Sequence, residues 1–170
     1  LLFHLLEQRH CIGDMLFMLQ KEVVDRMAAA PGGKDYGRLS VMLQWQLRVE
    51  KLFDVRPGAF TPPPKVDSSV VRLVPHATPP IQVRDADAFA HLVRAAFAQR
   101  RKTLRNALSK QCGSEQLQAV GIKPELRAEQ LPVGFAREPL VETQARHAAH
   151  SISAQQPVRQ GGTVQPFRQR

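Results

Sequence analysis

The sequence predicts an α/β fold followed by a small all-α part, and three observations support this prediction. A run at residues 14–19, apolar after Asp14, precedes a helical pattern, and the two together make a strand–helix unit. Two later strand-like segments flank a stretch of three prolines and predict an antiparallel hairpin. Beyond residue 80 the apolar spacing changes from two to 3.6, the period of an α-helix.

The first strand is expected at residues 14–19, with the sequence DMLFML. Such an apolar run suits the centre of a parallel sheet, where helices cover both faces of each strand. The helix that follows carries Val23, Val24 and Met27 on one face and stops at the Pro-Gly-Gly of residues 31–33. A second helical pattern covers roughly residues 38–46.

Sheet building resumes at residues 47–56, with an irregularity near Glu50 and Lys51. Residues 60–64 (FTPPP) cannot continue the ladder, because consecutive prolines lack N–H donors, so they form a rigid loop. Residues 66–74 are rich in valine and return as the next strand. The two strands make an antiparallel hairpin at the end of an otherwise parallel sheet.

Helices dominate the remainder up to about residue 136. Phe89, Leu92 and Val93 mark one face of an amphipathic helix, and further helices are expected around residues 104–108 and 117–120, with a helix stop at Gly121 and a new start at Pro124. We expect four segments: the sheet at 1–75, a linker at 76–80, a small helical domain at 81–136 and a disordered, polar tail at 137–170.

Composition favours a nucleic-acid partner. Lys and Arg outnumber Asp and Glu 24 to 15, a net charge of +9. The two cysteines, Cys11 and Cys112, lie far apart without neighbouring metal ligands, so no disulfide framework or zinc site is predicted and a reducing cytoplasm fits. Residues 1–6 are apolar but too short to span a bilayer, and the missing initiator Met suggests a fragment.

Phe60 is the first candidate for a binding site. A rigid proline loop that holds an aromatic ring can offer the ring to an unpaired base, a contact worth about 1–3 kcal/mol. The alternative is a proline-stiffened hairpin in which Phe60 packs in the core.

A basic cluster at a helix boundary is the second candidate. It comprises Arg100, Arg101, Lys102, Arg105 and Lys110. Cations at helical spacing can bind successive phosphates, giving salt-dependent affinity with little sequence preference, although an ordinary solvated helix face has the same pattern.

Two further patterns are weaker. Residues 20–22 (QKE) end the first strand, where open α/β sheets bind ligands, but they equally suit a helix N-terminus. His147 and His150 have no thiol or carboxylate partner that would make a metal site.

Several motifs in order resemble one family. Residues 60–71 (FTPPPKVDSSVV), 97–108 (FAQRRKTLRNAL) and 121–129 (GIKPELRAE), with 17–23 and 36–41 upstream, resemble the ribosomal RNA adenine-N6,N6 dimethyltransferases. This family is similar to the erythromycin-resistance methyltransferases and the eukaryotic dimethyladenosine transferases. The resemblance covers residues 1 to about 136 and implies a Rossmann-like class I methyltransferase sheet.

The resemblance implies S-adenosylmethionine-dependent transfer of methyl groups to N6 of two adjacent adenines in the 3′-terminal hairpin of small-subunit (16S) ribosomal RNA. It implies Phe60 as the ring that faces the target adenine. Small-subunit RNA and the pre-30S particle would be the partners of a monomeric cytoplasmic enzyme, without membrane or metal. In the family, an Asn-Leu-Pro-Tyr loop positions the amino nitrogen for in-line transfer.

The chain departs from this family in two places. The glycine-rich donor loop, the acidic ribose-binding residue and the Asn-Leu-Pro-Tyr loop are absent, so no catalytic or cofactor-binding residue carries over. From Glu138 on, the sequence no longer follows the family. We therefore expect a C-terminal fragment of the enzyme that is inactive alone; the alternative is a non-catalytic RNA-binding or ribosome-assembly module. Kinship to the mitochondrial transcription factors that share this fold is disfavoured.

Overall fold

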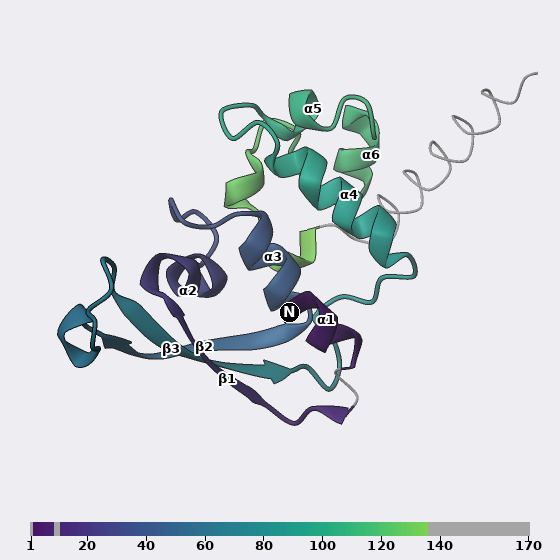
Figure 1. Cartoon of the computed structure of the whole chain (residues 1–170). Coiled ribbons are helices and arrows are strands. Elements are labelled where there is room, and N and C mark those ends of the chain that lie inside the picture. The colour runs from purple at the N-terminus through teal and green to yellow at the C-terminus, as the bar shows by residue number, and fades with distance from the viewer. Residues whose placement is uncertain (1, 9–10, 136–170) are drawn as a thin grey trace, which may run out of the picture.

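The fold is a three-stranded sheet with helices on one face and a separate group of helices beside it (Figure 1). It is known from a computed structural model, which describes residues 2–8 and 11–135. The strands are β1 (Met15–Gln20), β2 (Leu47–Val55) and β3 (Ser68–Pro75). The strand order is β1-β3-β2, and β3 is antiparallel to both neighbours. The strands β1 and β2 therefore run in the same direction, with β3 between them.

The prediction that β1 is a central strand of a parallel sheet, buried on both faces, is wrong for the described residues. The strand lies at an edge and pairs only with β3, in antiparallel register. Leu16 and Met18 are 63% and 52% exposed, whereas Met15 is buried. A continuous apolar run shows that both faces of the strand are suited to burial. It does not show that this chain provides the segments that pack on both faces.

The predicted hairpin is confirmed by the pairing of β2 with β3. The predicted irregularity is also present, because the register shifts between Lys51 and Phe53. Such a bulge places one extra residue in β2 and bends the strand.

Three helices lie on the same side of the sheet in Figure 1: α1 (Leu2–Glu7), α2 (Lys21–Ala28) and α3 (Arg38–Gln44). Side chains of all three helices and of the strands form a common core: Leu6, Val24, Met27, Leu43, Leu47, Val71 and Leu73. On the other face, Leu16, Met18 and Phe53 stay exposed. The sheet is therefore one-sided in the described part of the chain.

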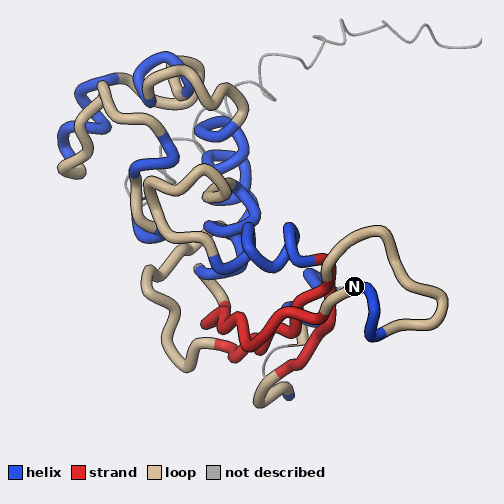
Figure 2. Tube along the Cα trace, turned by 90° about the vertical axis from the view of Figure 1, so that its left-hand side faces the viewer, coloured by secondary structure: helices blue, strands red, loops and turns tan. Residues whose placement is uncertain are grey.

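The helical part consists of α4 (Ala86–Phe97), α5 (Leu104–Ala107) and α6 (Ser114–Ala119), followed by the 3-10 turns η3 (Ala128–Gln130) and η4 (Val133–Phe135). Figure 2 shows these helices at one end of the molecule and the strands at the other. Asp85 caps α4 by accepting a 2.9 Å hydrogen bond from the Ala88 N–H. Gly121 ends the α6 segment at φ 78°, as predicted, but Pro124 lies in a turn and begins no helix.

The hydrophobic cores do not divide at the predicted linker. Tyr36, Met42 and Trp45 belong to the core of the helical part, and the rings of Trp45 and Phe89 lie 4.6 Å apart. The four-segment division stays a prediction, and residues 136–170, with His147 and His150, lie outside the described residues. Among the described helices, none has the length and apolar character needed to cross a membrane.

Candidate RNA interface

The basic cluster lies on the turn between α4 and α5 and on the residues that follow. Arg101, Lys102, Arg105 and Lys110 are exposed. The turn is held to the loop between α6 and η3 by two backbone hydrogen bonds, from the Leu104 N–H to the Leu126 oxygen at 2.8 Å and from the Arg105 N–H to the Pro124 oxygen at 3.0 Å. Buried Leu104 and Leu108 anchor it from below. The cations thus stand on a fixed turn.

Arg100 differs from the other members of the cluster, because its guanidinium already has protein partners. It donates a 2.5 Å hydrogen bond to the backbone oxygen of Lys34 and lies 3.8 Å from Glu129. Arg100 therefore joins the helical part to the α2–α3 connection.

A basic groove of about 310 Å³ lies at this junction. Its lining includes the cations Arg26, Lys34, Arg38 and Arg100, beside Tyr36 and Phe97. The Tyr36 hydroxyl is buried without a hydrogen-bond partner in the described structure, and burial raises the pKa of Tyr36 to about 12. Sequence reasoning missed Arg26, Lys34 and Arg38 because they are separated along the chain; only the net positive charge signalled them.

The proline loop connects β2 to β3 across residues 56–67. It begins with the 3-10 turn η2 (Pro57–Ala59), and the Phe60 N–H closes this turn with a 3.1 Å hydrogen bond to the Pro57 oxygen. The Thr61–Pro62 peptide bond is cis. Phe60 is half-buried and belongs to neither hydrophobic core, so core packing does not account for it. Its role in base stacking stays a prediction.

Residues 20–22 lie beside a pocket of about 460 Å³ at the end of β1, but the side chains of Lys21 and Glu22 form ion pairs within α2. Lys21 lies 2.5 Å from Asp25, and Glu22 lies 2.5 Å from Arg26, both at helical i,i+4 spacing. The alternative interpretation, a helix N-terminus, accounts for this segment.

A charged cluster at the same end of the sheet joins α2, β2 and β3. We call it the ion-pair cluster; its members are Lys21, Asp25, Lys51, Asp54 and Ser69. Lys51 lies 2.7 Å from Asp25 and 2.8 Å from Asp54. Hydrogen bonds from Lys21 and then Lys51 lower the pKa of Asp25, and hydrogen bonds from Lys51 and then Ser69 lower the pKa of Asp54. The same two carboxylates raise the pKa of Lys51. No sequence motif indicated this cluster.

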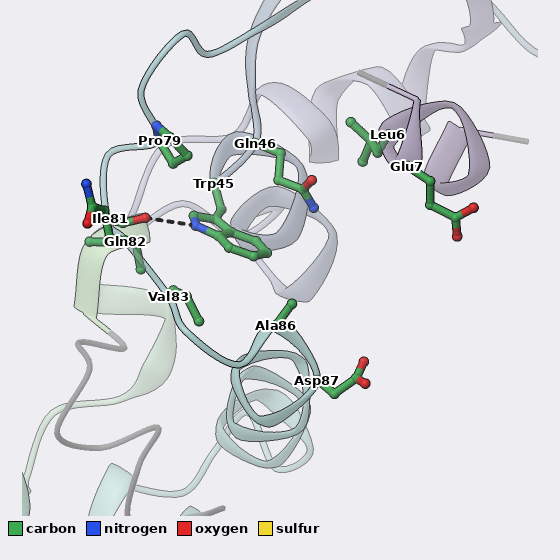
Figure 3. Close-up of a pocket in the computed structure, with 10 residues that line it drawn as sticks. All are labelled: Leu6, Glu7, Trp45, Gln46, Pro79, Ile81, Gln82, Val83, Ala86 and Asp87. Carbon is green, nitrogen blue, oxygen red and sulfur yellow. Dashed lines mark hydrogen bonds between the residues drawn. The ribbon is translucent and has the colours of Figure 1, made fainter. Parts of the chain in front are cut away.

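A cavity of about 640 Å³ lies beside Trp45 and Gln46, just before β2 begins (Figure 3). Trp45 stands at its centre and donates a 3.2 Å hydrogen bond to the Ile81 oxygen, while the carboxylates of Glu7 and Asp87 lie at its rim. None of the predicted site residues lines it. No group of three or more metal-ligating side chains occurs among the described residues.

Comparison with known proteins identifies the family of the chain. The family described as "Ribosomal RNA adenine dimethylase" matches residues 1–137. A protein of Xanthomonas campestris pv. campestris (strain B100) named "Ribosomal RNA small subunit methyltransferase A" is 60% identical over 133 residues, which cover 78% of this chain and 51% of that protein. A protein of the same name from Pseudomonas aeruginosa PAO1 is 59% identical over 131 residues, or 77% of this chain and 49% of its own length.

Two solved structures share the fold. A dimethyladenosine transferase from Plasmodium falciparum aligns with a TM-score of 0.67 at 24% identity, covering 86% of this chain and 62% of that one. The 23S rRNA methyltransferase ErmE aligns with a TM-score of 0.51 at 21% identity, covering 80% and 55%. The chain spans about half the length of the curated relatives it matches. Since the family profile matches most of its residues, the chain belongs to the ribosomal RNA adenine dimethylase family.

Proposed function

We propose that this chain is the RNA-binding, C-terminal part of an enzyme that dimethylates N6 of two adjacent adenines in the 3′-terminal hairpin of small-subunit ribosomal RNA. The family match over residues 1–137 carries this proposal, together with relatives named for small-subunit RNA methylation. Small-subunit RNA in the pre-30S particle is the proposed partner. We propose that the whole enzyme is a monomer in the cytoplasm.

Two parts of the chain would contact the RNA in different ways. The exposed cations Arg101, Lys102, Arg105 and Lys110 would bind phosphates on several sides of a folded RNA, with the basic groove beside them. Phe60 would stack on an adenine turned out of the RNA stack, which compensates part of the few kcal/mol that unstacking costs. The phosphates would supply affinity and the ring would fix the target base.

The methyl donor of the family is S-adenosylmethionine, and the residues present here do not fit it. The glycine-rich loop and the acidic ribose-binding residue are absent from the sequence. The pocket at the end of β1 is lined mostly by charged and polar side chains, among them Lys21, Asp25 and Lys65, and offers no aromatic wall to an adenine ring. No catalytic step is therefore assigned to this chain.

The second candidate function is a non-catalytic RNA-binding or ribosome-assembly module. It is favoured by a different observation: the chain keeps the basic cluster and lacks the donor motifs. Both candidates predict RNA binding. A methylation assay distinguishes them only when this chain is part of a complete enzyme.

RNA binding is tested by the salt dependence of affinity for a small-subunit RNA hairpin, measured by fluorescence anisotropy. Arg101→Ala/Lys102→Ala is expected to reduce the slope of log K against log salt by roughly 0.7–0.9 per cation removed. Arg100 is left in place because it also joins two parts of the fold. The matched control, Arg48→Ala/Arg72→Ala, removes two cations from the sheet.

The control variant should keep the slope of the unmodified chain. An unchanged slope in the Arg101/Lys102 variant, or an equal loss in both variants, would show that the basic cluster does not bind the phosphates.

A further inference from the structure

The proline loop is stiff along its length but is attached only at its two ends. From Thr61 to Val66 the described structure contains no hydrogen bond or ion pair. Three consecutive prolines restrict φ at residues 62–64 and so reduce the flexibility of this stretch. A stiff segment without hydrogen bonds or ion pairs of its own is oriented by its attachment points. The direction of Phe60, which the η2 turn links to Arg56 and Pro57, therefore depends on where the loop leaves β2 and enters β3.

The ion-pair cluster lies at these attachment points. Asp54 and Ser69 are opposite each other in the β2–β3 ladder, one pair from its end at Val55 and Ser68. The Ser69 hydroxyl, fully buried, donates a 2.5 Å hydrogen bond to Asp54 Oδ1, and Lys51 Nζ lies 2.8 Å from the same oxygen. The cluster therefore ties together the two strands that carry the loop.

The helix α2 adds a second attachment. The backbone N–H of Lys21, its first residue, donates a 2.9 Å hydrogen bond to the Asp67 oxygen at the returning end of the loop. The side chains of Lys21 and Lys51 both contact Asp25 of α2, at 2.5 Å and 2.7 Å. The loop ends are thus fixed to α2 as well as to each other.

The bulge in β2 is what allows this arrangement. In a regular strand, residues three apart point to opposite faces, so Lys51 and Asp54 would be separated by the sheet. The extra residue between Lys51 and Phe53 reverses the alternation, and both side chains then reach the face covered by α2. An irregularity of one residue thereby brings an acceptor for Ser69 to the base of the loop.

We propose that Asp54 and Ser69 are positioning residues that fix the direction of the proline loop and, through it, the ring of Phe60. This inference rests on the proposed stacking function of Phe60. It assigns the two residues no contact with RNA; they act through the loop.

The test uses the full chain and an RNA hairpin whose loop carries 2-aminopurine in place of one of two adjacent adenines. Stacking on Phe60 quenches the fluorescence of 2-aminopurine, and Phe60→Ala provides the unstacked reference. Ser69→Ala is expected to lower the stacking equilibrium about tenfold, the effect of losing one hydrogen bond to a charged group. Overall affinity, measured by anisotropy, should change less than about threefold, because phosphate contacts supply most of it.

Two variants separate positioning from a general loss of stability. Ser69→Thr keeps the hydroxyl and should restore quenching. Glu50→Gln removes the ion-pair partner of Arg48 and Arg72 from the neighbouring strand β2, away from the loop, and should leave quenching unchanged. If Ser69→Ala unfolds the chain, as judged by circular dichroism, Asp54→Asn takes its place, with the same expected direction.

A second measurement does not depend on stacking. A nitroxide on Thr61→Cys, with Cys11 replaced by Ser, should show narrower electron paramagnetic resonance lines when Ser69→Ala is added, because the loop moves more freely. If Phe60→Ala leaves quenching unchanged, the stacking function is wrong and the resonance lines alone decide the positioning. If Phe60→Ala abolishes quenching while Ser69→Ala changes neither signal, the positioning inference is overturned.

Discussion

At the scale of single residues, the ion-pair cluster makes the free energy of unfolding depend on pH. The pKa of Asp25 is lowered in the folded state by Lys21 and Lys51, so its contribution is present above the unfolded pKa near 4 and is lost as pH falls through the folded value. Asp25→Asn should cost about 1 kcal/mol at pH 7, a modest value because the side chain is about one-third exposed. The difference between the two proteins should shrink steadily below about pH 5.

Urea unfolding at pH 7 and at a series of lower pH values checks this prediction. Asp35→Asn is the matched control, because Asp35 is exposed and forms no ion pair in the described structure. A cost of Asp25→Asn that did not change with pH would contradict the assignment of this ion pair.

The residue scale also shows what sequence reasoning could reach. Phe60 and the run around Arg101 were identifiable because their chemistry is contiguous in the sequence. Arg26 and Lys34 of the basic groove, and the contact of Asp25 with Lys51, depend on segments that meet only after folding. Contiguity, more than chemical type, decided which site residues were predicted.

At the scale of elements, the helices and strands follow their apolar periods, whereas the order of the strands does not. The periods placed α2, α4 and the β2–β3 hairpin close to their observed bounds. Nothing in the run of residues 14–19 indicated that β3 would separate β1 from β2, because pairing is decided by long-range contacts. The same run could not show that one face of β1, with Leu16 and Met18, would be exposed to solvent in the described structure.

The two edges of the sheet differ in protection. The outer strand β2 carries a bulge and charged residues such as Arg48 and Glu50, devices that discourage pairing with another chain. The outer strand β1 has neither, and it exposes Leu16 and Met18. We therefore expect the 170-residue chain to self-associate through β1 as its concentration rises.

Leu16→Lys should reduce this association at least severalfold, as measured by sedimentation velocity across a concentration series. Phe53→Lys is the matched control: it replaces an equally exposed apolar side chain on the same face, but on the protected edge. Equal effects of both substitutions would mean that general apolar exposure, and not the β1 edge, drives association.

At the scale of the whole molecule, we expect RNA binding and methyl transfer to lie in different parts of the enzyme. The basic cluster and Phe60 lie within the segment that matches the C-terminal part of the relatives, while the donor motifs are absent from this sequence. The purified chain, incubated with tritiated S-adenosylmethionine and unmodified small-subunit RNA, should transfer no label above background while binding the RNA in a salt-dependent manner. The full-length Xanthomonas relative, assayed in parallel, should transfer label under the same conditions. Label transfer by the 170-residue chain alone would show that a donor site exists among residues to which none has been assigned, and the separation of binding from chemistry would then be wrong.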